Sequence, residues 1–259
     1  MKKCLFAAFS MLMLCSLLVM MTAGTVIAGN PAYSITEYGA MSTKVFDGHW
    51  SDPLEWYDGP VLEMDDGSAL AVYNIDFGTF MIQWCVEFFD DDTDDEGDYW
   101  QIYVDDSNKG GSAPQPVQYR IDIIGHTDLV MYEGDGTGWT EITPMDGEIV
   151  WANMIDGSPR NTTPHWILEI GIIKTMRVAT NAPPTGMMVA AYDESTDTLV
   201  SWPPDADVNN PDTWGLVADF SMDPIPEGLT FAVMAFLSSV SLVVGSHYLQ
   251  KRSKKRETV

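Results

Sequence analysis

The chain is predicted to be all-β: an antiparallel β-sandwich of jelly-roll or immunoglobulin-like type, followed by one C-terminal transmembrane helix. Three observations carry this prediction. Many short segments alternate apolar and polar residues with a period of two, and clusters of Gly, Asp, Asn and Pro separate them. Long stretches suited to a helix occur only near the two ends of the chain. Many short strands with turns between them favour a sandwich.

The N-terminus is predicted to be a secretory signal peptide, residues 1–28. Lys2 and Lys3 precede a long apolar stretch, and Ala28 closes a segment that suits cleavage by a signal peptidase. A retained signal anchor is the alternative, because the apolar stretch is long. Residues 29–44 are interpreted as a leader to the folded domain.

The sandwich is predicted to span residues 45–221. Alternation is clearest in residues 80–88, where every even position is large and apolar while Gln83 and Glu87 stand at odd positions. Further strands are predicted at residues 100–105, 118–124, 129–133, 148–154, 166–170, 187–192 and 198–202.

An acidic loop joins the first two of these strands and is a candidate calcium site. Residues 90–98 hold seven carboxylates, and the predicted ligands are Asp92, Asp94, Glu96 and Asp98. The segment is no EF-hand, because its twelfth position, counted from Asp92, is Tyr103 rather than Glu. A hard cation such as Ca²⁺ would relieve the repulsion between these carboxylates. The alternative is a loop that is merely solvated.

The charge of the chain excludes one class of partner. The formal net charge is −25, and every acidic residue except Glu257 lies within residues 29–228. Such a surface repels nucleic-acid phosphates and favours cations, basic partners or neutral ligands. Acidity that only keeps the protein soluble is the simpler explanation.

Cysteine usage and a glycosylation motif fit an exported domain without disulfides. Only Cys85 lies outside the predicted signal peptide, and its apolar surroundings favour a packed side chain over a reactive thiol. Asn161 begins the sequon Asn-Thr-Thr in a segment that is typical of a surface loop, so we expect N-glycosylation there.

Catalytic motifs are absent from the sequence, so the protein is predicted not to be an enzyme. It contains no G-x-S-x-G, P-loop or H-E-x-x-H pattern. The tryptophans allow a binding role instead. Several stand next to predicted turns, where they suit either stacking on sugar rings or closing the ends of a sandwich: Trp50, Trp56, Trp139, Trp202 and Trp214.

Several segments, in order, resemble the family 9 carbohydrate-binding modules and their DOMON-like relatives. They are Phe46-Asp47-Gly48-His49-Trp50-Ser51, the strand from Phe80 with its acidic loop and residues 100–105, the turn 105–111 with Gln118-Tyr119-Arg120, residues 165–172, Tyr192-Asp193, Ser201-Trp202-Pro203 and residues 210–215. The resemblance covers roughly residues 45–220.

This resemblance implies a sandwich that binds a polysaccharide or surface glycan, often with structural calcium. Arg120 stands where the family places a ligand arginine, Gln101 where it places a glutamate, and Asn209 and Asn210 match a ligand asparagine segment. Tyr99 is the aromatic residue at the loop where the xylanase-linked modules carry a clamping tryptophan. A cell-surface structural or adhesion protein with the same fold and no sugar site is the alternative.

The C-terminus predicts an extracellular domain on a single-pass membrane anchor. Residues 222–228 contain two prolines and suit a short stalk. Residues 229–249 carry no Asp, Glu, Lys or Arg and would span about 31 Å as a helix. The basic tail 250–259 then stays in the cytoplasm. Stalk, span and tail together resemble the C-terminal sorting signals of archaeal surface proteins, in which case the helix is either retained or removed.

Overall fold

A computed structural model describes residues 28–36, 39–40, 42–50, 52–65, 67–106, 108–173 and 184–218. These residues form two sheets, as the alternating pattern predicts, and only two short helical turns. The segments predicted as signal peptide up to residue 27, stalk, membrane span and basic tail lie outside the described residues. Within the described residues, no helix combines the length and the apolar character needed to cross a membrane.

The larger sheet, called sheet A, has eight strands in the order β1-β13-β11-β5-β6-β7-β8, and β12 also pairs with β11. All its pairings are antiparallel except that of β1 with β13. Its strands are β1 (Ser34–Thr36), β5 (Tyr99–Asp105), β6 (Gln118–Ile124), β7 (Asp128–Gly134), β8 (Trp139–Ile142), β11 (Thr185–Asp193), β12 (Thr198–Trp202) and β13 (Gly215–Ala218).

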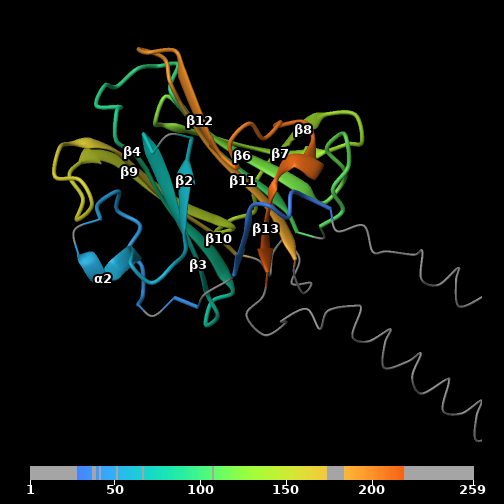
Figure 1. The fold of residues 1–259 in the computed structure, drawn as a ribbon, viewed down its shortest axis with the longest axis horizontal. Helices are drawn as coiled ribbons and strands as arrows, with labels where there is room; N and C mark the ends of the chain where they lie inside the picture. Colours follow the sequence, from blue (N-terminus) through green and yellow to red (C-terminus); the bar gives the residue numbers. More distant parts are fainter. Residues whose placement is uncertain are drawn as a thin grey trace, which may run out of the picture. The chain divides into compact units, whose positions relative to one another are not determined.

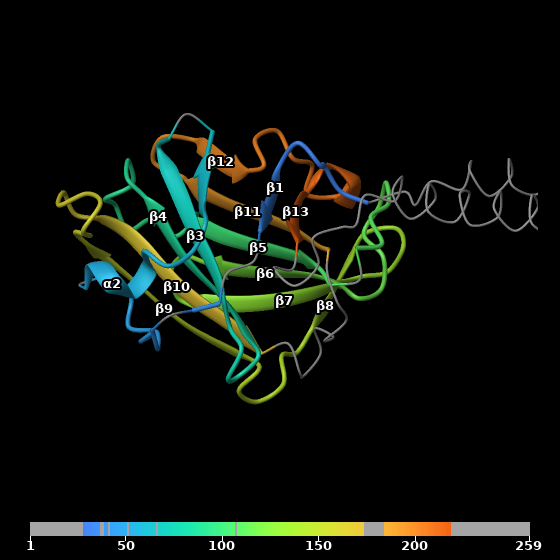
Figure 2. The same ribbon diagram turned by 60° about the horizontal axis from the view of Figure 1, so that its bottom comes forward.

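The smaller sheet, called sheet B, has the order β2-β3-β4-β10-β9 and is antiparallel throughout. Figure 1 and Figure 2 show the two sheets as separate layers. The strands of sheet B are β2 (Val61–Met64), β3 (Ala69–Asp76), β4 (Met81–Phe88), β9 (Ile149–Asp156) and β10 (His165–Ile173).

The main core lies between the facing sides of the two sheets. Its residues come from alternate positions of each strand, as period-two burial requires. Trp84 of β4, Trp100 of β5 and Trp166 of β10 all belong to it, which confirms that their phase marks the core face. The indole of Trp84 also donates a hydrogen bond to the sulfur of Met187 on the opposite sheet, at 3.0 Å.

The outer side of sheet B is covered by residues 42–50 and 52–58. Asp52 caps the short helix α2 (Pro53–Trp56) by accepting a hydrogen bond from the Leu54 amide, and Pro53 follows it at the helix start. Trp50 and Trp56 pack onto the sheet in a second buried cluster with Leu70, Val72, Cys85 and Ile167. Cys85 is therefore a packed side chain, as predicted.

The alternation predicts the long strands and misses several others. Each predicted strand corresponds to an observed one within a few residues, whereas β1, β2, β3, β8 and β13 were not predicted. β3 escapes detection because it is buried on both faces, so its residues show no polar alternation. Part of the segment interpreted as a leader also joins the sheets, through β1 and a bridge between Gly39 and Ile75.

Candidate functional site

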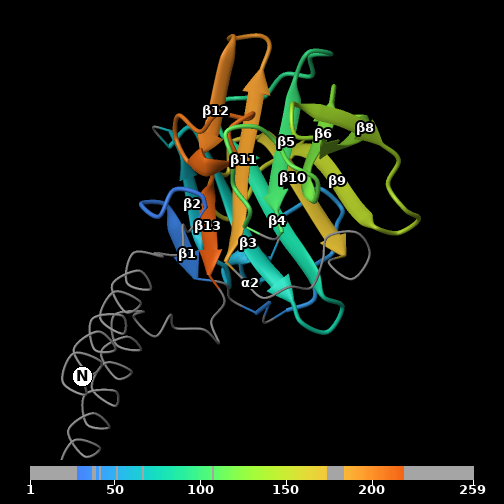
Figure 3. The same cartoon turned by 90° about the vertical axis from the view of Figure 1, so that its right-hand side faces the viewer.

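The outer side of sheet A carries the predicted ligand residues. Side chains alternate along a strand, so in β5 Trp100 points to the core while Tyr99 and Gln101 point outward. In β6, Arg120 lies directly opposite Tyr103 of β5, and therefore on the same outward side. Figure 3 shows β11, β5 and β6 side by side. The sheet thus brings Tyr99, Gln101 and Arg120 together.

A bidentate ion pair forms the polar centre of this surface. The guanidinium of Arg120 donates from Nε to Asp122 Oδ1 at 2.8 Å and from its Nη2 to Asp122 Oδ2. Asp122 is 2% exposed, and this burial raises the pKa of its carboxyl, although the bond to Arg120 opposes the rise. Burial lowers the pKa of Arg120, but the bond to Asp122 and the charges of the neighbouring acidic groups together outweigh it, so the pKa is raised. In both groups the ion pair thus opposes the effect that burial has on the pKa.

Two more polar side chains are fixed around this pair. The Tyr103 hydroxyl donates to Gln101 Oε1 at 2.8 Å, and the Gln101 side chain is also hydrogen-bonded to Asp122. The guanidinium carbon of Arg120 lies 4.8 Å from the ring centre of Tyr132 on β7. The result is a rigid polar network whose exposed parts belong to Arg120 and Tyr132.

Aromatic rings flank the polar centre on two sides. On one side, Tyr99 of β5 and Tyr192 of β11 are register partners, and their rings stack at 4.9 Å with an interplanar angle of 16°. On the other side, Trp139 of β8 and Trp214 lie parallel, 6.2 Å apart, and both lean on Tyr103. Trp214 is fully buried, so Trp139 is the ring of that pair that reaches the surface.

Sequence reasoning did not assign Asp122, Tyr132 or Tyr192 to the site, and it named Trp139 only among the tryptophans suited either to sugar stacking or to closing the sandwich. One signal was available: Tyr132 and Asp122 stand at outward positions of strands β7 and β6, on the same parity as Arg120. The remaining information is the strand order, which places β11 next to β5. Local sequence patterns do not supply that order.

Asn209 and Asn210 lie in the loop that leads to the short helix η1 (Pro211–Thr213). This loop packs against the outer side of sheet A through Ala206 and Val208, which contact the cluster around Tyr103 and Trp214. Asn209 is exposed, while the Asn210 side-chain oxygen is buried without a hydrogen-bond partner. The two asparagines thus reach the same side of the sandwich as Arg120, at the Trp214 end.

The acidic loop places its carboxylates in two groups, which share Asp98. One group is Asp95, Asp98 and Asp193, and its oxygens lie within 4.8 Å of one another. The loops are already tied there, since Asp98 accepts hydrogen bonds from the amides of Asp95 at 3.1 Å and Glu194 at 2.8 Å. Three carboxylates suit a hard cation, and Ca²⁺ would need further oxygens to reach six to eight ligands.

The second group contains Asp91, Asp98 and His126, all buried. His126 Nε2 lies 3.1 Å from Asp98 Oδ2, and its ring stacks on Trp166 at 3.4 Å. Burial raises the pKa of Asp91 to about 7, so this carboxyl is partly protonated at neutral pH. A site that needs charged oxygens is better served by the first group.

The sequence-predicted calcium ligands are only partly gathered. Asp98 belongs to both carboxylate groups, whereas Asp92, Asp94 and Glu96 are exposed and belong to neither. Sequence reasoning missed Asp193, which comes from the end of β11 almost a hundred residues away. Asn161, the predicted glycosylation site, lies in the loop before β10, and its side-chain oxygen accepts a hydrogen bond from the Thr163 amide at 3.0 Å.

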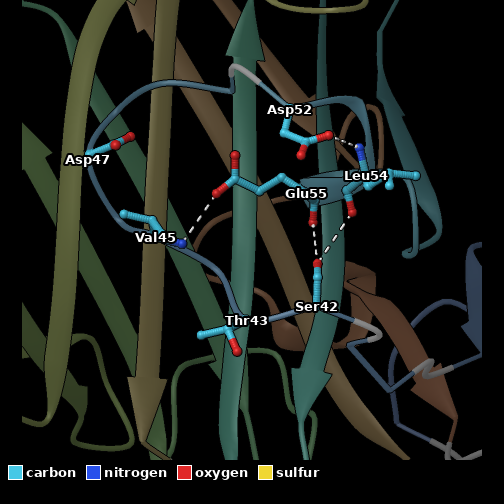
Figure 4. A pocket seen from close by; sticks show the side chains of 7 residues that line it. All are labelled: Ser42, Thr43, Val45, Asp47, Asp52, Leu54 and Glu55. Carbon is cyan, nitrogen blue, oxygen red and sulfur yellow. Dashed lines mark hydrogen bonds between the residues drawn. The ribbon is translucent and has the colours of Figure 1, made fainter.

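A pocket of about 290 Å³ lies in the segment that covers sheet B (Figure 4). Its wall combines the carboxylates of Asp47, Asp52 and Glu55 with the apolar side chains of Val45 and Leu54. The carboxylates are engaged locally: Asp52 caps α2, and Glu55 Oε1 accepts from the Val45 amide at 3.2 Å. Burial raises the pKa of Glu55. The pocket lies apart from the predicted ligand residues of sheet A.

Comparisons with known proteins give the following picture. No protein-family profile matches the chain, and no curated protein matches it. Among solved structures, the chain is similar to a family 9 carbohydrate-binding module from Caldicellulosiruptor kristjanssonii in complex with cellotriose, with 11% identity, 72% of this chain and 92% of that chain covered, and a TM-score of 0.46. The same module in complex with glucose gives 12% identity, 74% and 99% coverage, and a TM-score of 0.47.

A protein from Bacteroides uniformis ATCC 8492, named as a candidate carbohydrate-binding protein, is also similar. The identity is 12%, 72% of this chain and 99% of that chain are covered, and the TM-score is 0.49. These likenesses concern the fold and not the identity of any site residue.

Proposed function

We propose that this chain is a non-catalytic carbohydrate-binding protein, displayed outside the cell on a single-pass C-terminal membrane anchor. The ligand lies on the outer side of sheet A. The single observation that carries the proposal is the bidentate Arg120–Asp122 pair, whose arginine side chain is 23% exposed and is flanked by the ring of Tyr132 at 4.8 Å. Sugar rings present an apolar face and a rim of hydroxyls, and a charged fork beside an aromatic ring offers a partner for each.

Calcium is part of the proposal as a structural ion. Asp95, Asp98 and Asp193 would hold it and join the acidic loop to the end of β11. The signal peptide, the anchor and the glycosylation of Asn161 belong to the same proposal, and they rest on the sequence patterns described above.

The binding assay uses the full chain in detergent micelles and a panel of immobilised polysaccharides. We expect retention on at least one polysaccharide, and about tenfold weaker binding for Arg120→Lys, because lysine keeps the charge but loses the planar fork. Arg160→Lys is the matched control, since Arg160 lies on the sheet B side over Trp50 and Tyr57. Equal loss in both variants would point to general destabilisation instead of a site.

A structural or adhesion role without sugar binding is the second candidate. It is favoured by one observation: the Arg120 guanidinium is already satisfied by Asp122, so it offers only its remaining donors to a ligand. Retention on none of the polysaccharides, together with normal thermal unfolding of the chain, would establish this candidate over the first.

A further inference from the structure

We infer that Asp91, Asp98 and His126 bind one transition-metal ion, for which Zn²⁺ is the best fit, at one end of the sandwich. One ligand atom from each of these three side chains lies within 4.8 Å of the other two. We call the three residues the zinc triad. The inference does not depend on sugar binding, and it concerns a different ion from the proposed Ca²⁺, although Asp98 belongs to both groups.

The zinc triad joins the two sheets. Asp91 follows β4 of sheet B, whereas Asp98 precedes β5 of sheet A and His126 lies in the turn between β6 and β7 of sheet A. The backbone is tied at these points, since the Trp166 amide donates to the Asp91 carbonyl at 2.9 Å and the Gly125 amide donates to the Asp98 carbonyl at 2.8 Å. All three side chains are buried, so the folded domain brings them together before any ion binds.

The hydrogen bonds of His126 leave its Nε2 as a free acceptor in the neutral ring. Asn153 Nδ2 donates to the His126 carbonyl at 2.9 Å, so Asn153 Oδ1 is the atom that meets His126 Nδ1, also at 2.9 Å. An amide oxygen only accepts, and Nδ1 therefore carries the proton. The lone pair of Nε2 then points at Asp98 Oδ2, another acceptor, 3.1 Å away. Two facing acceptors need a cation between them.

The surroundings of the imidazole match those of a metal ligand. The histidines that bind metals usually donate their other ring N–H to an oxygen acceptor, which fixes both the tautomer and the orientation of the ring. Asn153 of β9 supplies that acceptor here. Trp166 of β10 stacks on the imidazole with 3.4 Å between ring centres and an interplanar angle of 6°, which holds the ring plane. The His126 side chain is only 5% exposed.

A divalent ion would also balance the charge of the zinc triad. Asp91 and Asp98 are 2% and 0% exposed, and among the described residues no Lys or Arg forms an ion pair with either of them. A second proton on His126 would supply one positive charge for two buried carboxylates, whereas Zn²⁺ supplies two. Buried charges need such compensation, because they have lost their hydration.

The types and spacing of the ligands favour Zn²⁺ over Ca²⁺. Ca²⁺ takes six to eight oxygen ligands, whereas Zn²⁺ is bound by imidazole nitrogen and carboxylate oxygen in sets of four. With bonds of about 2.0–2.2 Å, neighbouring ligand atoms of a tetrahedral zinc lie about 3.3–3.6 Å apart. His126 Nε2 and Asp98 Oδ2 are 3.1 Å apart, which is close to this spacing. Water would supply the fourth ligand.

Equilibrium dialysis against ZnCl₂ tests the inference, with the untagged full chain in detergent micelles after removal of bound metal. We expect one Zn²⁺ per chain and a melting temperature several degrees higher with zinc than without it. His126→Asn and Asp91→Asn should each weaken zinc binding at least tenfold. Both variants suit the local backbone, because asparagine tolerates the positive φ of His126 and can still accept the hydrogen bond from the Thr93 amide at position 91.

A positioning residue and two control variants separate the zinc triad from unspecific binding. Asn153→Ala should weaken zinc binding about 10–100-fold, because the imidazole loses the acceptor that orients it. His49→Asn is the matched control, since His49 also pairs with a carboxylate, Asp156 at 2.7 Å, but lies outside the zinc triad. Asp95→Asn should leave zinc binding unchanged.

Three results would overturn the inference. The first is no uptake of zinc at micromolar ZnCl₂ together with a His126 ring that carries both protons at neutral pH, observed by nitrogen NMR, because a proton then bridges Nε2 and Asp98. The second is an equal loss of zinc in the His49 and His126 variants. The third is displacement of zinc by Ca²⁺ at equal concentration. Failure of the chain to bind any polysaccharide would overturn the proposed function and leave zinc binding in place.

Discussion

A buried carboxylate, Glu169, holds the covering segment onto sheet B. It lies on β10 with no exposure and accepts hydrogen bonds from the amides of Asp47 and Gly48 at 2.9 Å and from the Trp56 indole at 2.7 Å. Three donors from one segment converge on one side chain, which ties Asp47, Gly48 and Trp56 to β10. Arg120 and Asp122 play the comparable role on sheet A, where one ion pair fixes the polar centre of the outer surface.

Glu169 makes the free energy of unfolding depend on pH. Burial raises the pKa of its carboxyl from 4.5 to about 7, against the three hydrogen bonds. Between these two values the folded protein holds this proton more tightly than the unfolded chain does. The contribution of Glu169 to the free energy of unfolding therefore falls as the pH rises from about 4.5 to about 7, and stays low above that.

Glu169→Gln removes this titration. We expect the variant to be less stable by about 1–3 kcal/mol at pH 5, because one oxygen that accepts a hydrogen bond is replaced by an NH2 group, which cannot accept one. The difference from the unmodified protein should shrink between pH 5 and pH 8. Urea unfolding at four pH values measures both curves. Parallel curves would show that Glu169 titrates alike in the folded and unfolded states.

Asp98 joins two loops, one at the start of β5 and one at the end of β11. The acidic loop before β5 and the turn after β11 meet there, since Asp98 accepts hydrogen bonds from the amides of both Asp95 and Glu194. The acidic loop therefore has a structural role, which is to hold the turn after β11, and its composition alone does not reveal that role. Asp95 and Asp98 lie next to Asp193 at this turn, whereas Asp92, Asp94 and Glu96 are exposed to solvent.

Calcium should stabilise this junction. With affinities of 10⁻⁴ to 10⁻³ M, about 10 mM Ca²⁺ would raise the free energy of unfolding by about 1.4–2.7 kcal/mol. Asp95→Asn should abolish most of that rise, while Asp92→Asn should leave it intact because Asp92 lies outside both carboxylate groups. Thermal unfolding with and without Ca²⁺ compares the three proteins. A rise that depends on Asp92 instead would favour the solvent-facing carboxylates.

Sequence patterns predict the strands more completely than they predict which side chains form the candidate site. Tyr99 and Gln101 could be placed on one side because they are two residues apart on a strand, and the strand is fixed by its own alternation. Tyr192 could not be placed beside Tyr99, because that neighbourhood depends on β11 pairing with β5 across more than eighty residues. Asp193 lies beside Asp98 through the same pairing, so this group of carboxylates could not be found from the sequence for the same reason.

The whole molecule carries an unbalanced negative charge of −25. Repulsion between like charges lowers the stability of the compact state, and salt screens it over a Debye length of about 10 Å at 0.1 M. We therefore expect the melting temperature to rise by several degrees between about 0.02 M and 0.5 M NaCl. An equally concentrated uncharged osmolyte, tested beside NaCl, separates screening from exclusion effects. An unchanged melting temperature in NaCl would contradict the expectation.

The sequence by itself determined the class of this protein, which is an acidic, disulfide-free, all-β domain. Its long strands can be predicted from the alternation of apolar and polar residues. Such properties are local, since the period of a strand and the charge of a segment are contained in consecutive residues. The tertiary structure decided which strands are neighbours, and through them which side chains share a surface. The stacked pair of Tyr99 and Tyr192 and the Asp95–Asp98–Asp193 group both depend on β11 lying against β5. This long-range pairing is chosen by the burial of the whole core and is recorded in no local pattern.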